Sequence, residues 1–291
     1  MKKLLILSGK GGTGKTTVAG AFIKLSNAKA FADCDVDAPN LHLIMEQKKE
    51  PLESHYYGMG KAKIAIEKCI SCGLCKKYCR FDAIKSDNGC YKVDEFFCEG
   101  CGVCEKNCHA EAIKLYPDIA GALMLYKNGV VFSTAELKMG SGTSGKLVTE
   151  VKKQLNTAEQ IADLAIIDGS PGIGCPVIAS LSGVDMVLVV AEPSLSGISD
   201  MERIILTAQK FNVKTAICVN KYDTNIENTR KIENLCNKQN LHFVGTIPFD
   251  SNVITALNKG KRIIDVDCAA TESIKNVYEK TLKILKNQSA K

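Results

Sequence analysis

A glycine-rich segment near the start of the sequence has the composition of a phosphate-binding loop. Residues 8–17 read Ser-Gly-Lys-Gly-Gly-Thr-Gly-Lys-Thr-Thr and lie between an apolar run, Leu4–Leu7, and a helix-like stretch. Glycines let successive backbone N–H groups face phosphate oxygens, and the following helix adds the positive end of its dipole. In such a loop Lys15 pairs with the β- and γ-phosphates, and the Thr16 hydroxyl ligates Mg²⁺. The segment predicts a nucleoside triphosphate site formed by Gly11, Gly12, Thr13, Gly14, Lys15, Thr16 and Thr17.

A second set of residues with a chemical spacing is a repeat of cysteines. The pattern Cys-x₂-Cys-x₂-Cys-x₃-Cys occurs in residues 69–85 and again 29 positions later, in residues 98–114. This is the spacing of bacterial two-cluster ferredoxins, in which the fourth cysteine of each run binds the other cluster. The expected [4Fe–4S] ligand sets are Cys69, Cys72, Cys75 and Cys108 for the first cluster, and Cys98, Cys101, Cys104 and Cys79 for the second.

Two zinc sites are the alternative interpretation of these cysteines, since zinc also accepts four thiolates. Zinc ligands usually come as two separated pairs, whereas three cysteines in close succession favour iron–sulfur clusters. Arg80 and His109 stand where the ferredoxin pattern has proline, and a cation beside each cluster would raise its reduction potential. A unit of about 50 residues buries little apolar surface, so the clusters are expected to supply much of its folding energy.

The composition limits the class of protein. Fourteen cysteines without a secretory signal indicate metal binding in a cytoplasmic protein, not disulfides. Apolar content of 45% and charged content of 24% are ordinary for a globular chain, and no run of about 18 apolar residues predicts a membrane span. The formal net charge of +6 would fall to roughly +2 with two clusters of about −2 each. We therefore expect no nucleic-acid partner.

The elements that must position these motifs alternate between strands and helices. Continuous apolar strands that alternate with helices predict an α/β fold, a mostly parallel sheet with helices on both faces. The strands are expected at Leu4–Leu7, Leu164–Asp168, Met186–Val190, Val213–Asn220 and His242–Ile247, and helices at 199–211 and 225–239. The cysteine repeat interrupts this series. It predicts a bacterial ferredoxin-like α+β domain at 61–116, inserted into a nucleotide-binding domain of residues 1–60 and 117–291.

The last helix candidate carries an apolar stripe of ordinary core width. We expect it to pack on the sheet, and the alternative is an amphipathic membrane anchor. The stripe consists of Ile274, Val277, Tyr278, Leu282 and Leu285.

The phosphate loop resembles the deviant Walker A signature of the MinD/ParA/Mrp superfamily of P-loop ATPases, which includes the nitrogenase iron protein. The resemblance rests on Lys10-Gly-Gly-Thr-Gly-Lys-Thr-Thr and runs nearly end to end. It implies that Lys10 reaches the nucleotide of a partner subunit across a two-fold interface, in the role of an arginine finger. The alternative for Lys10 is a solvated base. Lys10, Lys15 and Asp35 are the implied catalytic residues.

The same resemblance implies roles for residues far along the chain. Asp35 would position the attacking water, and the Mg²⁺ ligands would be Thr16, Asp33 and the Walker B acid Asp168. Residues 169–174 match switch II, and Asn220 and Pro248 match the contacts to adenine. For the acids of residues 33–37 the alternative is a helix N-cap or a solvated turn.

Cys175 lies seven residues after Asp168, where the nitrogenase iron protein has a cluster ligand. A second ligand is missing from the matching segment, residues 138–145, so we expect a small buried cysteine. The other isolated thiols are expected to be core or incidental residues.

Together these features predict an ATP-binding and ATP-hydrolysing iron–sulfur protein with ATP, Mg²⁺ and two [4Fe–4S] clusters as cofactors. ATP would close a homodimer, or a heterodimer with a paralogue, and drive electron transfer to a redox partner or metal-centre assembly in a metalloprotein. The alternative is a Min/Par-type positioning or scaffold ATPase whose clusters are structural or sensory. A cluster-transfer scaffold of the Mrp type is less favoured because no Cys-x-x-Cys follows residue 108.

Overall fold

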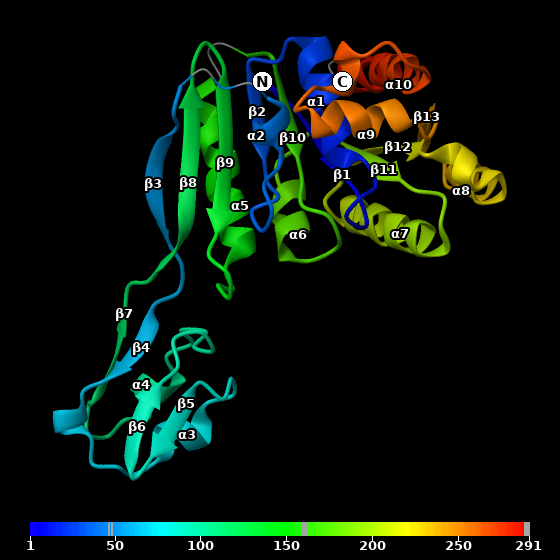
Figure 1. Ribbon diagram of the computed structural model, residues 1–291. Coiled ribbons are helices and arrows are strands. Elements are labelled where there is room, and N and C mark those ends of the chain that lie inside the picture. The colour runs from blue at the N-terminus through cyan, green and yellow to red at the C-terminus, as the bar shows by residue number, and fades with distance from the viewer. Residues whose placement is uncertain (46, 48, 159–161, 288–291) are drawn as a thin grey trace. The chain divides into compact units, whose positions relative to one another are not determined.

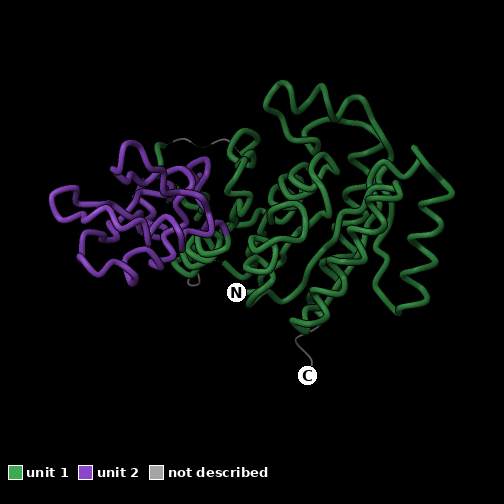
Figure 2. Tube along the Cα trace, turned by 90° about the horizontal axis from the view of Figure 1, so that it is seen from below, with its two compact units in different colours: residues 1–52, 124–135, 145–291 green, residues 53–123, 136–144 purple. Residues whose placement is uncertain are grey.

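The chain divides into two compact units (Figure 2). The computed structural model describes residues 1–45, 47, 49–158 and 162–287. Unit 1 comprises residues 1–52, 124–135 and 145–291, and unit 2 comprises residues 53–123 and 136–144.

Unit 1 is built on the parallel strands of a sheet whose strand order is β13-β12-β11-β1-β10-β2-β9-β8-β3 (Figure 1). Residues 53–57, 119–123 and 136–137 of this sheet belong to unit 2. Every pairing from β13 to β9 is parallel. The strands are β1 (Lys2–Leu7), β2 (Ala30–Asp33), β3 (Leu52–Tyr57), β8 (Ile119–Lys127), β9 (Val131–Leu137), β10 (Leu164–Asp168), β11 (Met186–Ala191), β12 (Lys214–Asn220) and β13 (His242–Ile247). The helices are α1 (Lys15–Ser26), α2 (Leu41–Ile44), α5 (Ser144–Gln154), α6 (Cys175–Leu181), α7 (Leu195–Lys210), α8 (Ile226–Lys238), α9 (Ser251–Asn258) and α10 (Ala269–Lys286).

Helices cover both faces of the parallel strands. In β1 all four residues from Leu4 to Leu7 are fully buried, although successive side chains of a strand point to opposite faces. Leu4 and Ile6 belong to a core that also contains Phe22 of α1 and Val277 of α10. Figure 1 shows α1, α9 and α10 on one side of these strands and α6 and α7 on the other. The predicted α/β fold with a mostly parallel sheet is confirmed.

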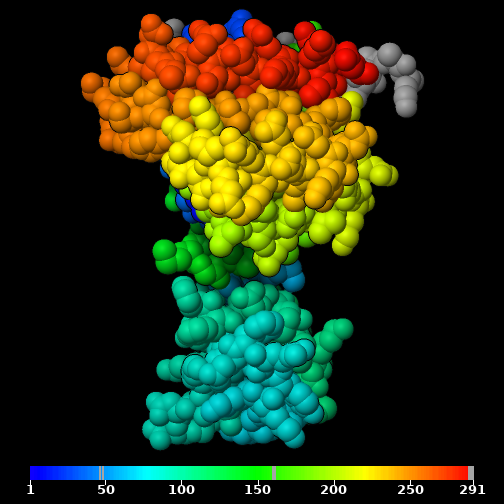
Figure 3. All heavy atoms as spheres, turned by 90° about the vertical axis from the view of Figure 1, so that its right-hand side faces the viewer, coloured from blue at the N-terminus to red at the C-terminus, as the bar shows by residue number. Residues whose placement is uncertain are grey.

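The apolar runs located the strands closely. β10 and β13 have the expected bounds, and β1, β11, β12, α7 and α8 lie where elements were predicted, with ends that differ by a few residues. The stripe of α10 packs inward, since Ile274, Val277 and Leu285 are buried in the core. In Figure 3 residues late in the sequence, coloured yellow to red, cover one side of unit 1. No helix in the described part of the chain is long and apolar enough to cross a membrane.

Unit 2 repeats one structural motif. Its elements include β4 (Lys61–Ile64), α3 (Leu74–Tyr78), β5 (Ile84–Asp87), β6 (Cys90–Val93), α4 (Val103–Lys106) and β7 (Ile113–Tyr116). Antiparallel ladders join β4 to β7 and β5 to β6. The starts of β4, α3 and β5 recur 29 residues later as the starts of β6, α4 and β7. The cysteine repeat of the sequence is thus also a repeat of the backbone.

The two halves of unit 2 share the same turn before their helices. Gly73 and Gly102 precede α3 and α4, and both have a φ of 75°. A positive φ is easy only for glycine, which explains why this residue recurs in both copies. Unit 2 is wider than the predicted insert of residues 61–116, because it also contains the segments 53–60, 117–123 and 136–144.

Candidate nucleotide site and cysteine cavities

The phosphate loop connects β1 to α1 and depends on its glycines. Gly12 and Gly14 have φ values of 79° and 89°, a conformation that residues with a Cβ rarely adopt. A Cβ on Gly14 would also lie 2.3 Å from the Asn220 amide nitrogen. The Thr13 hydroxyl is buried without a hydrogen-bond partner among the described residues. The glycines thus hold the loop in a tight turn, and the Thr13 hydroxyl remains available to a ligand.

Strand order gathers the acids beside this loop. Asp168 ends β10, which pairs with β1 on one side and with β2 on the other, so that Asp168 stands opposite both Ile6 and Asp33. Both carboxylates are completely buried, and Lys15 is only 5% exposed. The Lys15 Nζ lies 2.5 Å from Asp168 Oδ1. The site therefore holds two carboxylates around a single buried ammonium group.

The burial and closeness of these charges shift the pKa values of Asp33 and Lys15. Burial, together with the charge of Asp168, raises the pKa of Asp33 to about 7, although the N–H groups of Leu41 and Asp35 and the charge of Lys15 lower it. Burial acts to lower the pKa of Lys15, but attraction to Asp168, Asp33 and Asp35 outweighs burial and raises it. The cluster has one cation too few for two ionised carboxylates.

A divalent cation fits this arrangement. The Asp168 Oδ2 atom is buried and has no hydrogen-bond partner among the residues described. The Thr16 hydroxyl lies 3.4 Å from the Lys15 Nζ, so a third oxygen is near. Carboxylate and hydroxyl oxygens are the ligands that Mg²⁺ prefers. The residues predicted as magnesium ligands thus lie around one ammonium group that a phosphate could draw away.

Hydrogen bonds join the loop after β10 to the loop after β2. The Ser170 hydroxyl donates to the Cys34 carbonyl over 2.5 Å, and the Cys34 N–H donates to the Asp168 carbonyl over 2.7 Å. Asp33 also accepts from the N–H of Asp35 at 3.0 Å. Asp35 itself is half-buried, and burial raises its pKa although Lys15 lowers it. The loop after β10 is therefore tied by hydrogen bonds to the segment that carries Asp35.

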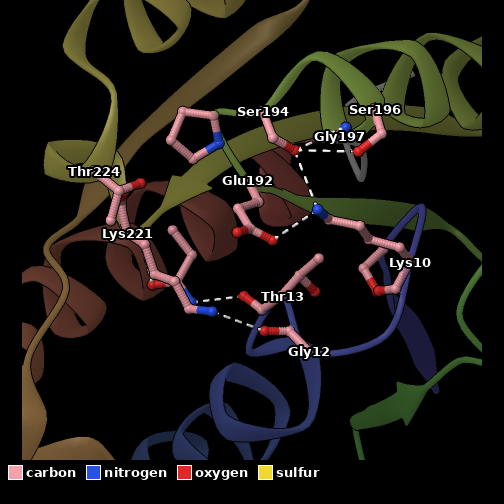
Figure 4. A network of polar contacts seen from close by, with 12 residues as sticks. Lys10, Gly12, Thr13, Glu192, Ser194, Ser196, Gly197, Lys221 and Thr224 are labelled. Carbon is pink, nitrogen blue, oxygen red and sulfur yellow. Dashed lines mark hydrogen bonds and ion pairs between the residues drawn. The ribbon is translucent and has the colours of Figure 1, made fainter.

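The Lys10 side chain contacts groups of its own chain. Its Nζ lies 3.3 Å from Glu192 Oε2 and donates to the Ser194 Oγ over 3.1 Å (Figure 4). Glu192 and Ser194 follow β11, the strand next to β1. No sequence pattern indicated these partners, which lie more than 180 residues from Lys10.

Asn220 and Lys221 brace the phosphate loop. The Asn220 amide donates to the Thr13 carbonyl over 2.6 Å. The Lys221 ammonium donates to the Gly12 carbonyl over 2.9 Å (Figure 4). Asn220 also accepts from the Lys221 N–H through its Oδ1 atom. The Asn220 amide, which was predicted to contact adenine, therefore makes a hydrogen bond to the phosphate loop. The sequence did not indicate this contact.

A pocket of about 660 Å³ of empty space, open solvent included, adjoins the loop. Gly12, Gly14 and Thr17 line one side of it, and Asn220 and Pro248 line it as well. The remaining walls are largely apolar and come from β13, α9, the loop between them and α10: Ile247, Phe249, Val253, Ile254, Leu257, Ala270 and Ile274. An apolar pocket beside a phosphate loop suits a flat heterocyclic base.

Unit 2 contains two cavities, each lined by four cysteines. One has about 350 Å³ of empty space, open solvent included, and its thiols are Cys69, Cys72, Cys75 and Cys108. The other has about 360 Å³, and its thiols are Cys79, Cys98, Cys101 and Cys104. The fold therefore sorts the eight cysteines into the two sets expected from the sequence, with the fourth cysteine of each run in the other cavity.

Backbone groups and neighbouring thiols act on these sulfurs. The N–H groups of Ala62 and Ala112 donate to the sulfurs of Cys98 and Cys108 over 3.5 and 3.3 Å. Burial, and then the nearby thiols of its own cavity, raises the pKa of Cys104 to about 11. Within the described residues no group of three or more His, Cys, Asp or Glu side chains is placed to hold a single metal ion. A zinc site would need four sulfurs around one ion.

Residues 4–263 match the model of the CobQ/CobB/MinD/ParA nucleotide binding domain. The chain belongs to this family. A protein of Methanocaldococcus jannaschii is 36% identical over 96% of this chain and 95% of its own length, and a second protein of that organism is 27% identical over 91% and 92%. The septum site-determining protein MinD of Helicobacter pylori is 28% identical, but over only 44% of this chain and 52% of its own.

Solved structures of the family share the fold at low identity. MinD of Pyrococcus horikoshii, complexed with Mg-ADP, has a TM-score of 0.59 at 15% identity and covers 97% of this chain and 96% of its own. The cell division ATPase MinD of Pyrococcus furiosus has a TM-score of 0.57 at 15% identity, over 97% and 99%. These likenesses agree with a P-loop nucleotide-binding fold, and at such identities they concern the fold alone.

The prediction for Cys175 is wrong. It was expected to be a small buried cysteine, but its side chain is exposed at the start of α6. The glycine-rich segment before it ends in an extended Gly174, and this places the first residue of α6 at the surface. Cys34, Cys218 and Cys236 are buried, as core thiols would be, whereas Cys90 is exposed.

Proposed function

We propose that the protein binds and hydrolyses ATP and that it couples this cycle to two [4Fe–4S] clusters held in unit 2. The observation that carries the proposal is the sorting of eight cysteines into two four-thiol cavities within a chain that has a P-loop nucleotide-binding domain. Electron transfer to a redox partner, or assembly of a metal centre in a metalloprotein, is the output that such clusters can serve.

The geometry of unit 1 supports the nucleotide half of the cycle. The phosphate loop binds the phosphates through its N–H groups, and Lys15 exchanges Asp168 for phosphate oxygens. The base enters the apolar pocket beside Pro248. Asp35, half-buried and tied to Asp33, would orient the attacking water, and Thr16, Asp33 and Asp168 would hold Mg²⁺. A bound magnesium ion would supply positive charge to the phosphoryl group being transferred.

The two four-thiol cavities of unit 2 support the cluster half of the proposal. The ligands of one cluster are Cys69, Cys72, Cys75 and Cys108, and those of the other are Cys79, Cys98, Cys101 and Cys104. Iron–sulfur clusters supply one-electron chemistry, whose potential depends on hydrogen bonds to the sulfurs. The N–H groups of Ala62 and Ala112 are in place to make such bonds. Lys61 donates to the Cys98 carbonyl over 2.6 Å and brings a cation close to the second set.

A dimer with Lys10 acting across the interface completes this proposal. The family signature supports it, and the partner could be an identical chain or a paralogue. Two proteins of M. jannaschii match this chain over more than nine tenths of its length, which supports the existence of paralogous pairs.

Iron analysis tests the cluster half. Anaerobically purified protein should contain about eight iron and eight sulfide per chain and should bleach on reduction. Cys72→Ser and Cys101→Ser should each reduce the iron content by about half. Cys90→Ser is the matched control, because Cys90 is exposed in unit 2 and lines neither cavity. Well-folded protein that contains zinc, or no metal, would contradict the cluster proposal and leave the nucleotide proposal intact.

A positioning or scaffold ATPase is the second candidate, favoured by the MinD proteins among the relatives and solved structures. In that case the clusters would be structural or sensory. Reduction potentials measured with and without a non-hydrolysable ATP analogue separate the candidates, since coupling requires a nucleotide-dependent shift. Replacement of Cys79 and Cys108 should leave nucleotide-dependent partner binding intact in a positioning ATPase and abolish the output of a redox protein.

A further inference from the structure

The two copies of the cysteine repeat carry charges of opposite sign. Residues 69–85 contain four basic side chains and one acid, whereas residues 98–114 contain two basic side chains and three acids. With histidine counted as neutral, the formal charges of the two segments are +3 and −1. Both copies form the same elements 29 residues apart, so the backbone does not require this difference. Charge of one sign on a surface acts on its partners more than on the fold.

The difference is concentrated at equivalent positions around the cysteines. Three glutamates of the second copy are replaced in the first copy: Glu95 by Ile66, Glu99 by Ile70 and Glu105 by Lys76. The two isoleucines are 61% and 68% exposed. Apolar side chains that lie in water with a polar rim are typical of interaction surfaces.

The replaced residues adjoin the first cavity. Ile70 and Cys72 both line this cavity, and both are exposed. The wall of the cavity at these residues is therefore also the surface of the molecule. A partner that covers Ile70 would lie one side chain away from the thiols of the first set.

Hydrogen bonds place the lysine on the same side of unit 2. The Ser71 hydroxyl donates to the Gly89 carbonyl over 2.7 Å, and the Lys76 ammonium donates to the Ser86 Oγ over 3.0 Å. Gly89 lies in the turn between β5 and β6, and Ser86 lies in β5. The segment before α3 and α3 itself thus lie along one hairpin, and Figure 1 shows α3 beside β5.

The positive charges of the first copy are not neutralised by the chain itself. Lys68 and Lys76 are exposed, and neither forms an ion pair with a carboxylate of the residues that the structure describes. In the second copy, by contrast, the Glu105 Oε1 atom lies 3.9 Å from the Lys114 Nζ. The uncompensated charge of the first copy is available to a partner of opposite sign.

We propose that Ile66, Lys68, Ile70 and Lys76, here called the basic face, dock an acidic protein that carries one electron at a time. The inference rests on the proposed function, in which unit 2 holds the clusters. In the reducing direction the carrier loses one electron and the cluster of the first cavity gains it, and no atom is transferred. Transient electron-transfer complexes have small interfaces and are steered by opposite charges, and the acids of the second copy repel the same carrier.

Binding of an acidic flavodoxin, kept in its oxidised form, measures docking without electron transfer. Isothermal titration calorimetry uses the iron-loaded full-length protein at low ionic strength. Lys76→Glu should weaken binding by roughly threefold to tenfold, and added salt should weaken binding to the original sequence. Lys106→Glu is the matched control, because it makes the same charge change at an exposed position of the second copy, and it should change the affinity by less than about twofold.

A double variant separates the place of the charge from its amount. Lys76→Glu combined with Glu105→Lys restores the net charge of the original sequence, and it should bind as weakly as Lys76→Glu alone. Ile70→Glu installs the glutamate of the second copy and should also weaken binding. The iron content of each variant checks that unit 2 is intact. If Lys76→Glu loses iron, Lys68→Glu takes its place.

Two further measurements locate the contact and its consequence. A carbodiimide joins carboxylates of the flavodoxin to lysines within contact distance, and mass spectrometry should find Lys68 and Lys76 among the products but not Lys106. In stopped-flow experiments with reduced flavodoxin, the rate of cluster reduction should fall in Lys76→Glu by the same factor as the affinity.

Several results would overturn the docking inference: no binding by the iron-loaded original sequence, full affinity in the double variant, or equal cross-linking of Lys106. Anionic vesicles or DNA that bind as tightly as flavodoxin, and lose binding in Lys76→Glu, would also overturn it, because the face would then bind any polyanion. Well-folded protein without iron would instead contradict the proposed function, and the electron exchange with it.

Discussion

The two units differ in what fills their interiors. The core of unit 1 contains large apolar side chains from both faces of a parallel sheet, including Phe22, Phe31 and Phe132. The buried cluster of unit 2 contains Ala62, Cys75, Ala83, Ile84, Cys98 and Ile113, so two of its six members belong to the cysteine sets. Unit 1 is held together by apolar burial, whereas unit 2 has little apolar surface to bury and is built around two cavities.

This difference predicts whether ligand binding is coupled to folding in each unit. In unit 1 the candidate nucleotide site lies at the carboxyl ends of strands that the core already fixes, so a ligand would meet a preformed site. In unit 2 the residues that would bind the clusters are part of the interior itself. Cluster binding and folding should therefore be one process in unit 2 and separate processes in unit 1.

The largest effect is expected from removal of the proposed clusters. Metal-free full-length protein should lose amide protection in the ladders of unit 2 by at least about a hundredfold, because little apolar core remains to hold them. The amides of β1 and β10 should keep their protection. Hydrogen exchange followed by mass spectrometry measures both units in one sample. Unchanged protection of β5 and β6 without metal would erase the contrast between the two interiors.

Lys15→Ala should damage unit 1 alone. It leaves the buried carboxylates of Asp33 and Asp168 without a cation, and breaking such a pair costs about 3–5 kcal/mol. Urea denaturation should show this loss, while the iron content stays unchanged. Lys24→Ala on the exposed side of the same helix is the control and should alter the stability by less than about 0.5 kcal/mol. An equal iron loss in Lys15→Ala would mean that the units do not fold separately.

The raised pKa of Asp33, about 7, predicts how pH affects unit 1. The folded state favours the protonated acid, so the contribution of Asp33 to stability is full below its unfolded pKa and declines as pH rises through about 7. Mg²⁺ binds the ionised acid, so the affinity for Mg²⁺ with nucleotide should rise about tenfold from pH 6 to pH 8. Calorimetric titration measures this rise. The same rise in Asp33→Asn would assign it to another group.

The smallest effect concerns the rim of the nucleotide pocket. Phe249 lines the pocket but is 50% exposed, so Phe249→Ala should weaken nucleotide binding by only about threefold to tenfold. Phe211→Ala is the control, because Phe211 is also partly exposed and lies outside the pocket. Fluorescence titration with a labelled nucleotide measures the change. Equal affinities for both variants would place the base elsewhere than in the pocket.

Most of the local structure of this protein could be predicted from its sequence. The apolar runs located the central strands within a few residues, because a strand buried on both faces needs an uninterrupted apolar segment. The spacing of the cysteines gave the two sets that the cavities bring together. Strands β3, β8 and β9 and helix α5 were not foreseen, since their patterns are weaker.

The amino-acid sequence by itself determined the phosphate loop, the parallel strands and the cysteine repeat, because each is encoded within a few tens of residues. Only the tertiary structure decided that Lys10 meets Glu192, that Asn220 supports Thr13 and that Cys175 is exposed. The physical reason is the strand order: β1 lies between β10 and β11, and this order brings side chains from distant positions to the same edge of the sheet. No local pattern encodes that neighbourhood.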